Sequence, residues 1–293
     1  MNTPVRIEDI DVSKIEIRKI TKKGKADDSK GKGYHVFYNN ERLEIILPEL
    51  DAPGGVTIFD KYEKIKVVVN LSFDGMKETV DGQLTKRAKR LATAHAKLVA
   101  LEDKIRTSII EKASEVFKDK KKQSNDVLTS RIRPFIYQPT AREDGRVFED
   151  SFGLQIPTKF SSLSEDDKKK KSIEELEFLK KQFQARPDSH LLVDKDGREV
   201  QVDGEEITLD NIQLAIPRRS RVKAVASFSY IWVTTSQECH SVWHFTHGLI
   251  TSDKKAQVLN IRADDDEDED DVVMEEEEVE YVEEEEEAVA VAA

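Results

Sequence analysis

The stretch Arg221-Val-Lys-Ala-Val-Ala-Ser-Phe-Ser-Tyr-Ile-Trp-Val233, followed after a short polar turn by Ser241-Val-Trp-His-Phe-Thr-His-Gly-Leu-Ile250, decides the fold class. Both stretches are rich in β-branched and aromatic residues, which favour strands. Because only a few polar residues separate them, we predict two antiparallel strands that pair directly. The C-terminal part of the folded domain is therefore expected to consist of β-strands.

Working outward, strand-like runs lie on both sides of a helical middle section. Each run is bounded by turn residues and contains either alternating or continuous apolar residues, at 12–20, 34–38, 43–47, 56–59, 65–73, 190–193, 199–202, 212–216 and 257–261. Strands, then helices, then strands again predict one mainly β (α+β) domain over residues 1–262. We expect a small barrel or sheet that is interrupted by helical insertions.

Two helices are predicted between the strands. The first covers about 81–118, with Asp81 as N-cap, because apolar or small residues recur at intervals of three or four, at Leu84, Ala88, Leu91, Ala94, Leu98, Leu101, Ile105, Ile109, Ala113 and Val116. The second covers about 172–184 and begins with a Ser-x-x-Glu capping box. Its expected inward residues are Ile173, Leu176, Leu179 and Phe183.

The charge of the chain is divided unevenly along the sequence. Residues 264–287 contain 18 acidic residues and no basic ones, which leaves 41 acidic and 47 basic residues, a net charge of +6, in positions 1–263. The acidic segment cannot bury enough apolar surface to offset the entropy of ordering it, and its charges repel one another. We therefore predict a disordered acidic tail over residues 263–293.

Several classes of protein are set aside by simple features. No apolar run approaches the roughly 18 residues that a membrane helix needs, so no membrane contact is expected. The N-terminus lacks the apolar core of a secretory signal. A single cysteine, Cys239, excludes a disulfide framework and favours a reducing, intracellular compartment.

The sequence favours neither a catalytic site nor a metal site. Cys239, His240, His244 and His247 lie close together, but successive strand residues point to opposite faces, so the four side chains do not converge as zinc requires. Ordinary strand histidines are the better interpretation. The sequence contains no Gly-x-Ser-x-Gly, His-Glu-x-x-His or P-loop motif. We expect a binding protein without metal or cofactor rather than an enzyme.

Two stretches combine cationic and aromatic residues, the types that hold single-stranded nucleic acid. Cations neutralise phosphates, and aromatic rings stack on bases of any sequence. The candidate contact residues are Arg131, Arg133 and Tyr137 in the first stretch, Arg218, Arg219, Arg221, Lys223, Tyr230 and Trp232 in the second, and Trp243 on the strand paired with it. Tyr230, Trp232 and Phe228 are spaced by two, so one strand face would carry all three.

An ordinary structural role competes with each of these assignments. An aromatic strand face is more often core than binding surface, and Phe228 is expected to be core. For Trp232 and Trp243 the two roles stay open, and each arginine could equally be a solvated surface residue.

The acidic tail suggests regulation. A flexible polyanion tethered to a cationic groove competes with DNA at high effective concentration and is released when DNA fills the groove. The residues that mark this regulatory tail are Asp264, Asp271, Glu278, Tyr281 and Glu287. A purely solubilising tail is the alternative.

A family resemblance rests on Lys64–Phe73, the long helix, Pro134–Tyr137, Arg221–Val233 and the Val242-Trp243 pair, in that order before an acidic C-terminus. This arrangement resembles the single-stranded-DNA-binding proteins of the podophage replication type, as encoded by large nucleocytoplasmic DNA viruses of eukaryotes. The resemblance implies an oligonucleotide-binding (OB) antiparallel barrel with an inserted helix and sequence-independent binding of single-stranded DNA in viral replication, recombination and repair.

The resemblance also implies partners and a location. The tail would contact DNA polymerase or other replication proteins, and a homodimer is a further option. The protein would act in the viral replication compartment of the host nucleus or cytoplasm, or be packaged in the virion. Two other functions remain open: an acidic-tailed chaperone for histones or basic virion proteins, and a virion structural protein.

Overall fold

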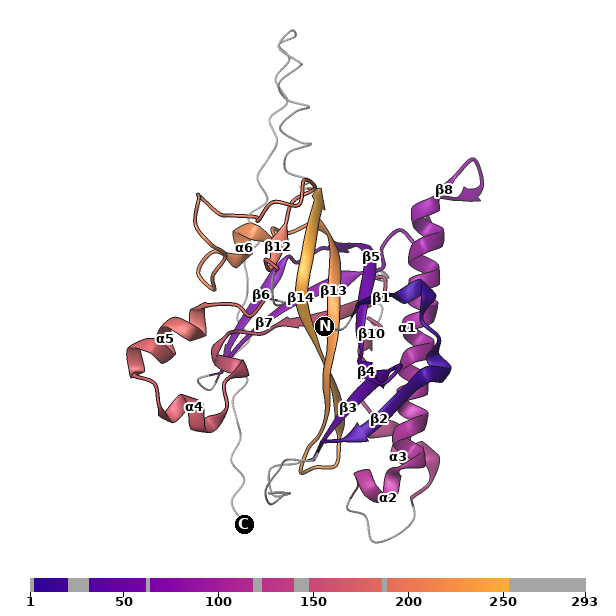
Figure 1. Cartoon of the computed structure of the whole chain (residues 1–293). Helices are drawn as coiled ribbons and strands as arrows, with labels where there is room; N and C mark the ends of the chain where they lie inside the picture. Colours follow the sequence, from indigo (N-terminus) through magenta and orange to yellow (C-terminus); the bar gives the residue numbers. More distant parts are fainter. Residues whose placement is uncertain are drawn as a thin grey trace, which may run out of the picture. The chain divides into compact units, whose positions relative to one another are not determined.

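The fold is taken from a computed structural model that describes residues 3–20, 32–61, 64–117, 123–139, 148–185 and 189–252. At its centre is a long hairpin of β13 (Ser220–Val233) and β14 (Cys239–Ser252), which runs through the middle of Figure 1. The two strands pair antiparallel along almost their whole length, which confirms the predicted pairing.

Five strands pair in a ring around the core. β5 (Glu44–Ala52) pairs with β7 (Lys64–Ser72), β7 with β11 (Ser151–Ile156), β11 with β14, β14 with β13, and β13 returns to β5.

The pairing of β11 with β14 is parallel, so the sheet is mixed, whereas the family resemblance implied an antiparallel barrel. The physical reason is the placement of the β13–β14 hairpin. The second strand of this hairpin, β14, pairs with β11, whereas the first strand, β13, runs in the opposite direction to β14.

Shorter strands extend this sheet at its edges. They are β1 (Val5–Arg6), β2 (Ile15–Lys19), β3 (Lys32–Tyr38), β4 (Glu41–Arg42), β6 (Val56–Lys61), β10 (Ile136–Tyr137) and β12 (Leu192–Val193). A separate hairpin of β8 (Thr79–Val80) and β9 (Gln83–Leu84) precedes the long helix. The predicted strand at 199–202 forms only isolated bridges, and the one at 257–261 lies outside the described residues.

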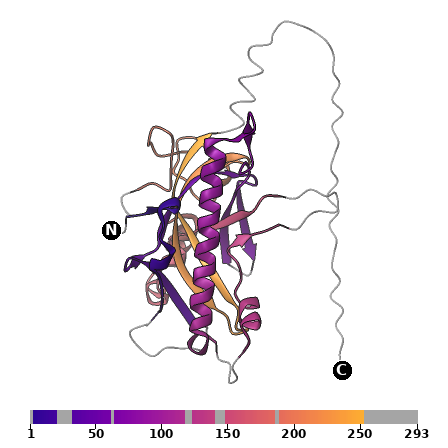
Figure 2. The same cartoon turned by 90° about the vertical axis from the view of Figure 1, so that its right-hand side faces the viewer.

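The long helix is present as α1 (Lys86–Glu111), which packs against β2 and β5 and runs along one side of the sheet (Figure 2). Its predicted stripe is buried at Ala88, Leu91, Ala94, Leu98, Leu101, Ile105 and Ile109. The predicted N-cap is wrong: Thr85 caps the helix, since Asp81 has φ 51° and forms the β8–β9 turn with Gly82. After Lys112 a short α2 (Ala113–Val116) continues the chain.

The remaining helices are short and connect the strands. They are α3 (Asn125–Ser130), α4 (Glu165–Lys169), α5 (Ile173–Lys181) and α6 (Ile212–Ala215), with 3₁₀ turns at Ile7–Asp9, Val12–Lys14 and Phe160–Ser162. α6 lies where the sequence predicted a strand. The backbone N–H groups of Ala215 and Ile216 donate to the carbonyls of Asn211 (3.2 Å) and Ile212 (3.0 Å), four residues earlier, and so close a helical turn at that point.

The capping box of α5 is confirmed, because Ser172 and Glu175 each accept a hydrogen bond from the other's backbone N–H. Its predicted inward face is wrong, however. No residue of α5 is buried, and Ile173 is 80% exposed; only Phe183, beyond the helix, is buried. The reason is its position: α4 and α5 project from the edge of the sheet (Figure 1).

The acidic tail lies outside the described residues, as do the predicted domain boundary at 262–263 and all five tail positions from Asp264 to Glu287. Among the residues that are described, no helix has the length and apolarity needed to cross a membrane.

Candidate nucleic-acid interface

The outer face of the sheet carries a continuous row of paired side chains. Paired residues on neighbouring strands share a face, and direct pairings connect Thr57 on β6, Val68 on β7, Gln155 on β11, His244 on β14 and Ser227 on β13. The residues on either side of this row in β7 and β11, such as Val67, Val69, Leu154 and Ile156, are buried. The row therefore crosses the outside of the ring.

The first cationic–aromatic stretch is fixed against the beginning of β14. The backbone N–H of Cys239 donates to the carbonyl of Arg131 (2.8 Å), and the N–H of Arg133 donates to the carbonyl of Cys239 (2.9 Å). Four residues later Tyr137 pairs with Ser151 of β11. The stretch thus runs from the tip of the β13–β14 hairpin to β11.

One half-buried carboxylate holds this stretch in place. Oε2 of Glu102, on α1, accepts hydrogen bonds from the backbone N–H groups of Phe135 (2.8 Å) and Ile136 (3.1 Å). Its Oε1 pairs with Nη2 of Arg106 at 2.6 Å. Since two successive N–H groups meet one carboxylate, the backbone between Arg133 and Tyr137 is well fixed.

The side chains of this stretch differ in their surroundings. Tyr137 is 64% exposed, on the same face as Ser151. Arg133 is exposed and pairs with Oε1 of Glu238 at 2.7 Å. Arg131 is half-buried, with its guanidinium 5.5 Å from the centre of the Phe117 ring. Of the three candidate contact residues in this stretch, Arg133 and Tyr137 are therefore the two that solvent and a ligand can reach.

A bulge in β13 decides which aromatic residues face outward. The register shifts between Phe228 and Tyr230, so the three aromatics do not share one face as the simple alternation predicted. Phe228 is fully buried, as expected, whereas Tyr230 is half-buried and Trp232 is 36% exposed. Trp232 pairs with His240, at the same end of β14 as Arg133 and Cys239.

Trp243 is a correction to the candidate contact residues. It is 2% exposed and packs at 4.7 Å, 5.2 Å and 5.6 Å, ring centre to ring centre, from Phe228, Phe152 and Phe135. Since its ring is enclosed by these aromatics, it is a core residue and has no face on which a base could stack. The alternation places it inward because its neighbours His244 and Val242 take the outer face.

The second cationic group lies at the opposite end of β13. Arg221 and Trp232 are eleven residues apart, which is roughly 35 Å along a strand. Arg221 contacts two carboxylates, Asp51 (3.2 Å) and Glu49 (3.5 Å), and Asp51 also pairs with Arg87 at 3.0 Å. Arg221 therefore serves a structural charge network between β13 and β5.

The other three cations of this group have fewer constraints. Arg218 and Arg219 are exposed, and Lys223 is half-buried on the same strand face as Arg221. Arg219 has a φ of 66°, and its backbone N–H donates to the carbonyl of Ala52 at 2.9 Å. These cations and Trp232 belong to one continuous stretch of the sequence, but in the structure they lie at opposite ends of the sheet.

The histidines of β14 contact different partners. His240 lies 3.5 Å from a carboxylate oxygen of Glu238, while Nδ1 of His247 lies 2.6 Å from the carbonyl of His190. Within the described residues no group of three potential ligands is placed to hold a metal ion.

Burial controls the chemistry of two further residues of β14. Burial, and then the nearby charge of Arg42, lower the pKa of His244 to about 4, so its imidazole is neutral at pH 7. Burial raises the pKa of the Cys239 thiol to about 12. Such a thiol carries almost no thiolate at neutral pH and is a poor nucleophile.

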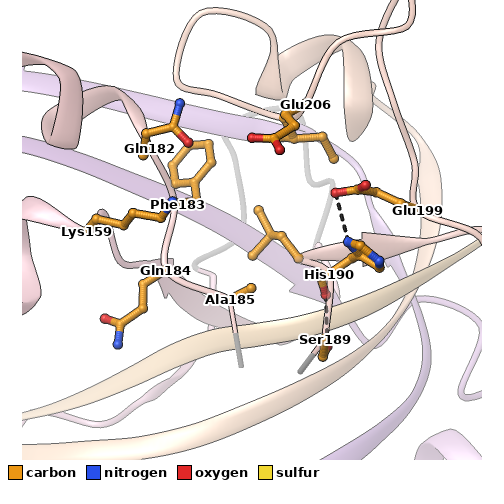
Figure 3. A pocket seen from close by; sticks show the side chains of 11 residues that line it. Lys159, Gln182, Phe183, Gln184, Ala185, Ser189, His190, Glu199 and Glu206 are labelled. Carbon is orange, nitrogen blue, oxygen red and sulfur yellow. Dashed lines mark hydrogen bonds and ion pairs between the residues drawn. The ribbon is translucent and has the colours of Figure 1, made fainter. Parts of the chain in front are cut away.

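A cavity of about 300 Å³ lies beside β12, lined among others by Lys159, Gln182 and Glu206 (Figure 3). In it, Nδ1 of His190 pairs with Oε1 of Glu199 at 2.9 Å. Next to these lining residues, Nδ1 of His247 lies 2.8 Å from the Ser189 hydroxyl and 2.6 Å from the His190 carbonyl. A nitrogen that donates to a carbonyl carries a proton, so it cannot serve as a base for Ser189.

Two outward residues were missed in the sequence. Phe59 on β6 is 46% exposed and pairs with Lys66 on β7, which is also exposed. They adjoin the row through Thr57 and Val68. Their signal was the alternation of Lys64-Ile-Lys-Val-Val, in which the charged residues fall on every second position.

Comparison with known proteins gives little. No protein-family model matches the sequence, and no curated protein matches it. Among solved structures the chain is similar to the crystal structure of gp2.5, a single-stranded DNA binding protein encoded by bacteriophage T7, with a TM-score of 0.35 and 12% sequence identity. That match covers 80% of this chain and 100% of the phage chain.

Proposed function

We propose that the protein binds single-stranded DNA, without sequence preference, across the outer face of β7, β11 and β14. The observation that carries this proposal is the placement of three exposed aromatic rings and two exposed cations around that face. The rings belong to Phe59, Tyr137 and Trp232, and the cations to Lys66 and Arg133.

The order of the ring supports an OB-type barrel. Counting the ring strands along the chain as one to five gives β5, β7, β11, β13 and β14, and the fifth strand lies between the third and the fourth. OB barrels are five-stranded Greek-key barrels that bind oligonucleotides over strands two and three and the loops one–two and four–five. In this chain those parts are β7, β11, the turn before β6 and the tip at residues 234–238.

The chemistry of the face suits binding without sequence reading. Aromatic rings stack on any base, and cations contact the phosphates that every sequence shares. The ion pair of Arg133 with Glu238 is exposed on both sides, with 56% and 34% of the side chains accessible. Such a surface pair contributes little stability, so the guanidinium can exchange Glu238 for a phosphate at small cost.

The role in the cell is part of the same proposal. The protein would protect single-stranded DNA during viral replication, recombination and repair. The acidic residues 264–287 would compete with DNA for the cationic face and bind a DNA polymerase or other replication proteins. A homodimer and a viral replication compartment belong to this picture as well.

A charge-reversal pair tests the DNA-binding proposal. Arg133→Glu should weaken binding of a fluorescent oligo(dT) in an anisotropy titration by at least tenfold, because it replaces a phosphate contact by repulsion. Arg198→Glu is the matched control. Arg198 is exposed on the turn after β12, which pairs with Gly248 and Leu249 of β14, whereas Arg133 lies at the Cys239 end of that strand. The Arg198 substitution should leave the affinity nearly unchanged. If the unmodified protein ignores oligo(dT) at low salt, the proposal is wrong.

A further inference from the structure

A second cavity, of about 290 Å³, lies at the β6 end of the outer face. Two chain segments line it: the turn and first residues of β6, and the α6 region with the residues that precede β13. The lining residues are Gly54, Val56, Thr57, Ile58, Gln213, Ile216 and Arg218. Thr57 belongs to the row that crosses β7, β11 and β14, so the cavity opens where that row ends.

The two segments are locked together by backbone contacts. Gly55 has a φ of 62°, and a Cβ at this position would come within 2.7 Å of the Ile216 carbonyl oxygen. The carbonyl of Ala52 accepts hydrogen bonds from the N–H groups of both Gly55 (3.0 Å) and Arg219 (2.9 Å). The amide of Gln213 also donates to the carbonyl of Val56 at 3.4 Å. The backbone that presents Arg218 is therefore fixed before any ligand arrives.

The chemistry of the lining favours an anion. Arg218 is the charged residue that lines the cavity, and the described lining residues include no carboxylate. Thr57 and Gln213 add a hydroxyl and an amide, both of which can donate to phosphate oxygens. The volume is at the lower limit of small-molecule sites, which suits a phosphate with part of its nucleotide rather than a larger ligand.

We propose that this cavity binds one phosphate of the bound single strand and so marks one end of the DNA path. The inference rests on the proposed function and adds a subsite to it. A strand would leave Trp232 and Tyr137, cross the row at His244, Gln155 and Val68, and place a phosphate on Arg218. Arg219, next in sequence but not lining the cavity, would not share this contact.

Substitutions at Gly54 test the subsite with little risk to the fold. A Cβ added there meets nothing within 4 Å, and its backbone needs no positive φ. In oligo(dT) titrations, and relative to Gly54→Ala as the reference, Gly54→Asp should weaken binding about tenfold and Gly54→Lys should strengthen it. Equal affinities of the Asp and Lys variants would overturn the proposal.

A second pair of variants measures the phosphate contact itself. Arg218→Ala should reduce the log–log slope of affinity against salt by about 0.7, the value for one phosphate of a single strand, while Arg219→Ala should leave the slope unchanged. Equal slopes for both variants would show a general surface charge and would overturn the subsite. If the wild-type protein binds oligo(dT) normally while these variants and the Gly54 variants have no effect, only the subsite fails. If wild type does not bind, the proposed function fails and the subsite with it.

Discussion

The two tryptophans offer a test of the whole interface, because the structure assigns them opposite roles. Trp232 is 36% exposed at the tip of the hairpin, whereas Trp243 is enclosed by Phe228, Phe152 and Phe135. Removing a stacked ring should cost roughly 1–3 kcal/mol of binding, or about 5- to 150-fold in Kd. Removing a buried tryptophan should cost roughly 3–5 kcal/mol of folding.

Each variant is therefore measured for its affinity for DNA and for its stability in urea. Trp232→Ala should bind oligo(dT) at least fivefold more weakly in an anisotropy titration and unfold in urea at nearly the wild-type midpoint. Trp243→Ala should unfold at a much lower urea concentration. A Trp232→Ala protein that loses several kcal/mol of stability but binds DNA as wild type would refute the assignment, since Trp232 would then be core.

Three further predictions follow from named groups. Glu238→Gln should raise the affinity for oligo(dT) severalfold, because the carboxylate that pairs with Arg133 no longer competes with phosphate; an unchanged Kd in the anisotropy titration would argue against that contact. His244 has a pKa of about 4, below the ordinary 6.5, so the unfolded chain takes up this proton first as the pH falls. Stability should drop by about 2–3 kcal/mol between pH 6.5 and pH 4, and His244→Gln should flatten this part of a urea-denaturation series; an equally steep variant would contradict it. Cys239, with a thiol pKa of about 12, should react with an aromatic disulfide reagent at pH 8 only after unfolding, and rapid labelling of the native protein would show that its burial is wrong.

Much of the fold follows from periodicity in the sequence. The three-to-four spacing from Ala88 to Ile109 predicted α1, and all of its stripe residues in that range are buried. The β-branched and aromatic residues of 221–233 and 241–250, with the short polar turn between them, predicted the β13–β14 pair. Local patterns succeed here because each element buries one face against the same core.

The errors have local physical causes. Asp81 was predicted as an N-cap, but an Asp-Gly pair also favours a tight hairpin turn. Here β8 and β9 pair on either side of Asp81 and Gly82, so the two residues form that turn. The bulge after Phe228 places Phe228 and Trp232 on opposite faces of β13. The amino-acid composition does not indicate where a strand contains one extra residue. The parallel contact of β11 with β14 is likewise a long-range property that no local pattern contains.

The candidate site was predicted in part. Arg133, Tyr137 and Trp232 do come to one end of the sheet, although nearly a hundred residues separate the first two from the third. Arg221 could not be recognised as part of a charge network, because its partner Asp51 lies far away in the sequence. Residue type reveals what a side chain can contact, and only the fold determines whether another protein group already occupies it.

The most direct test of the central claim is a salt titration of oligo(dT) binding by the full chain and by a chain ending at Arg262. We predict that log Kd rises linearly with log salt, with a slope of about 0.7 for each phosphate contacted. We also predict that removing the segment with 18 acidic residues makes binding tighter, most strongly at low salt. Binding that ignores salt, or no binding by either chain at low salt, would contradict the claim that the outer face holds single-stranded DNA.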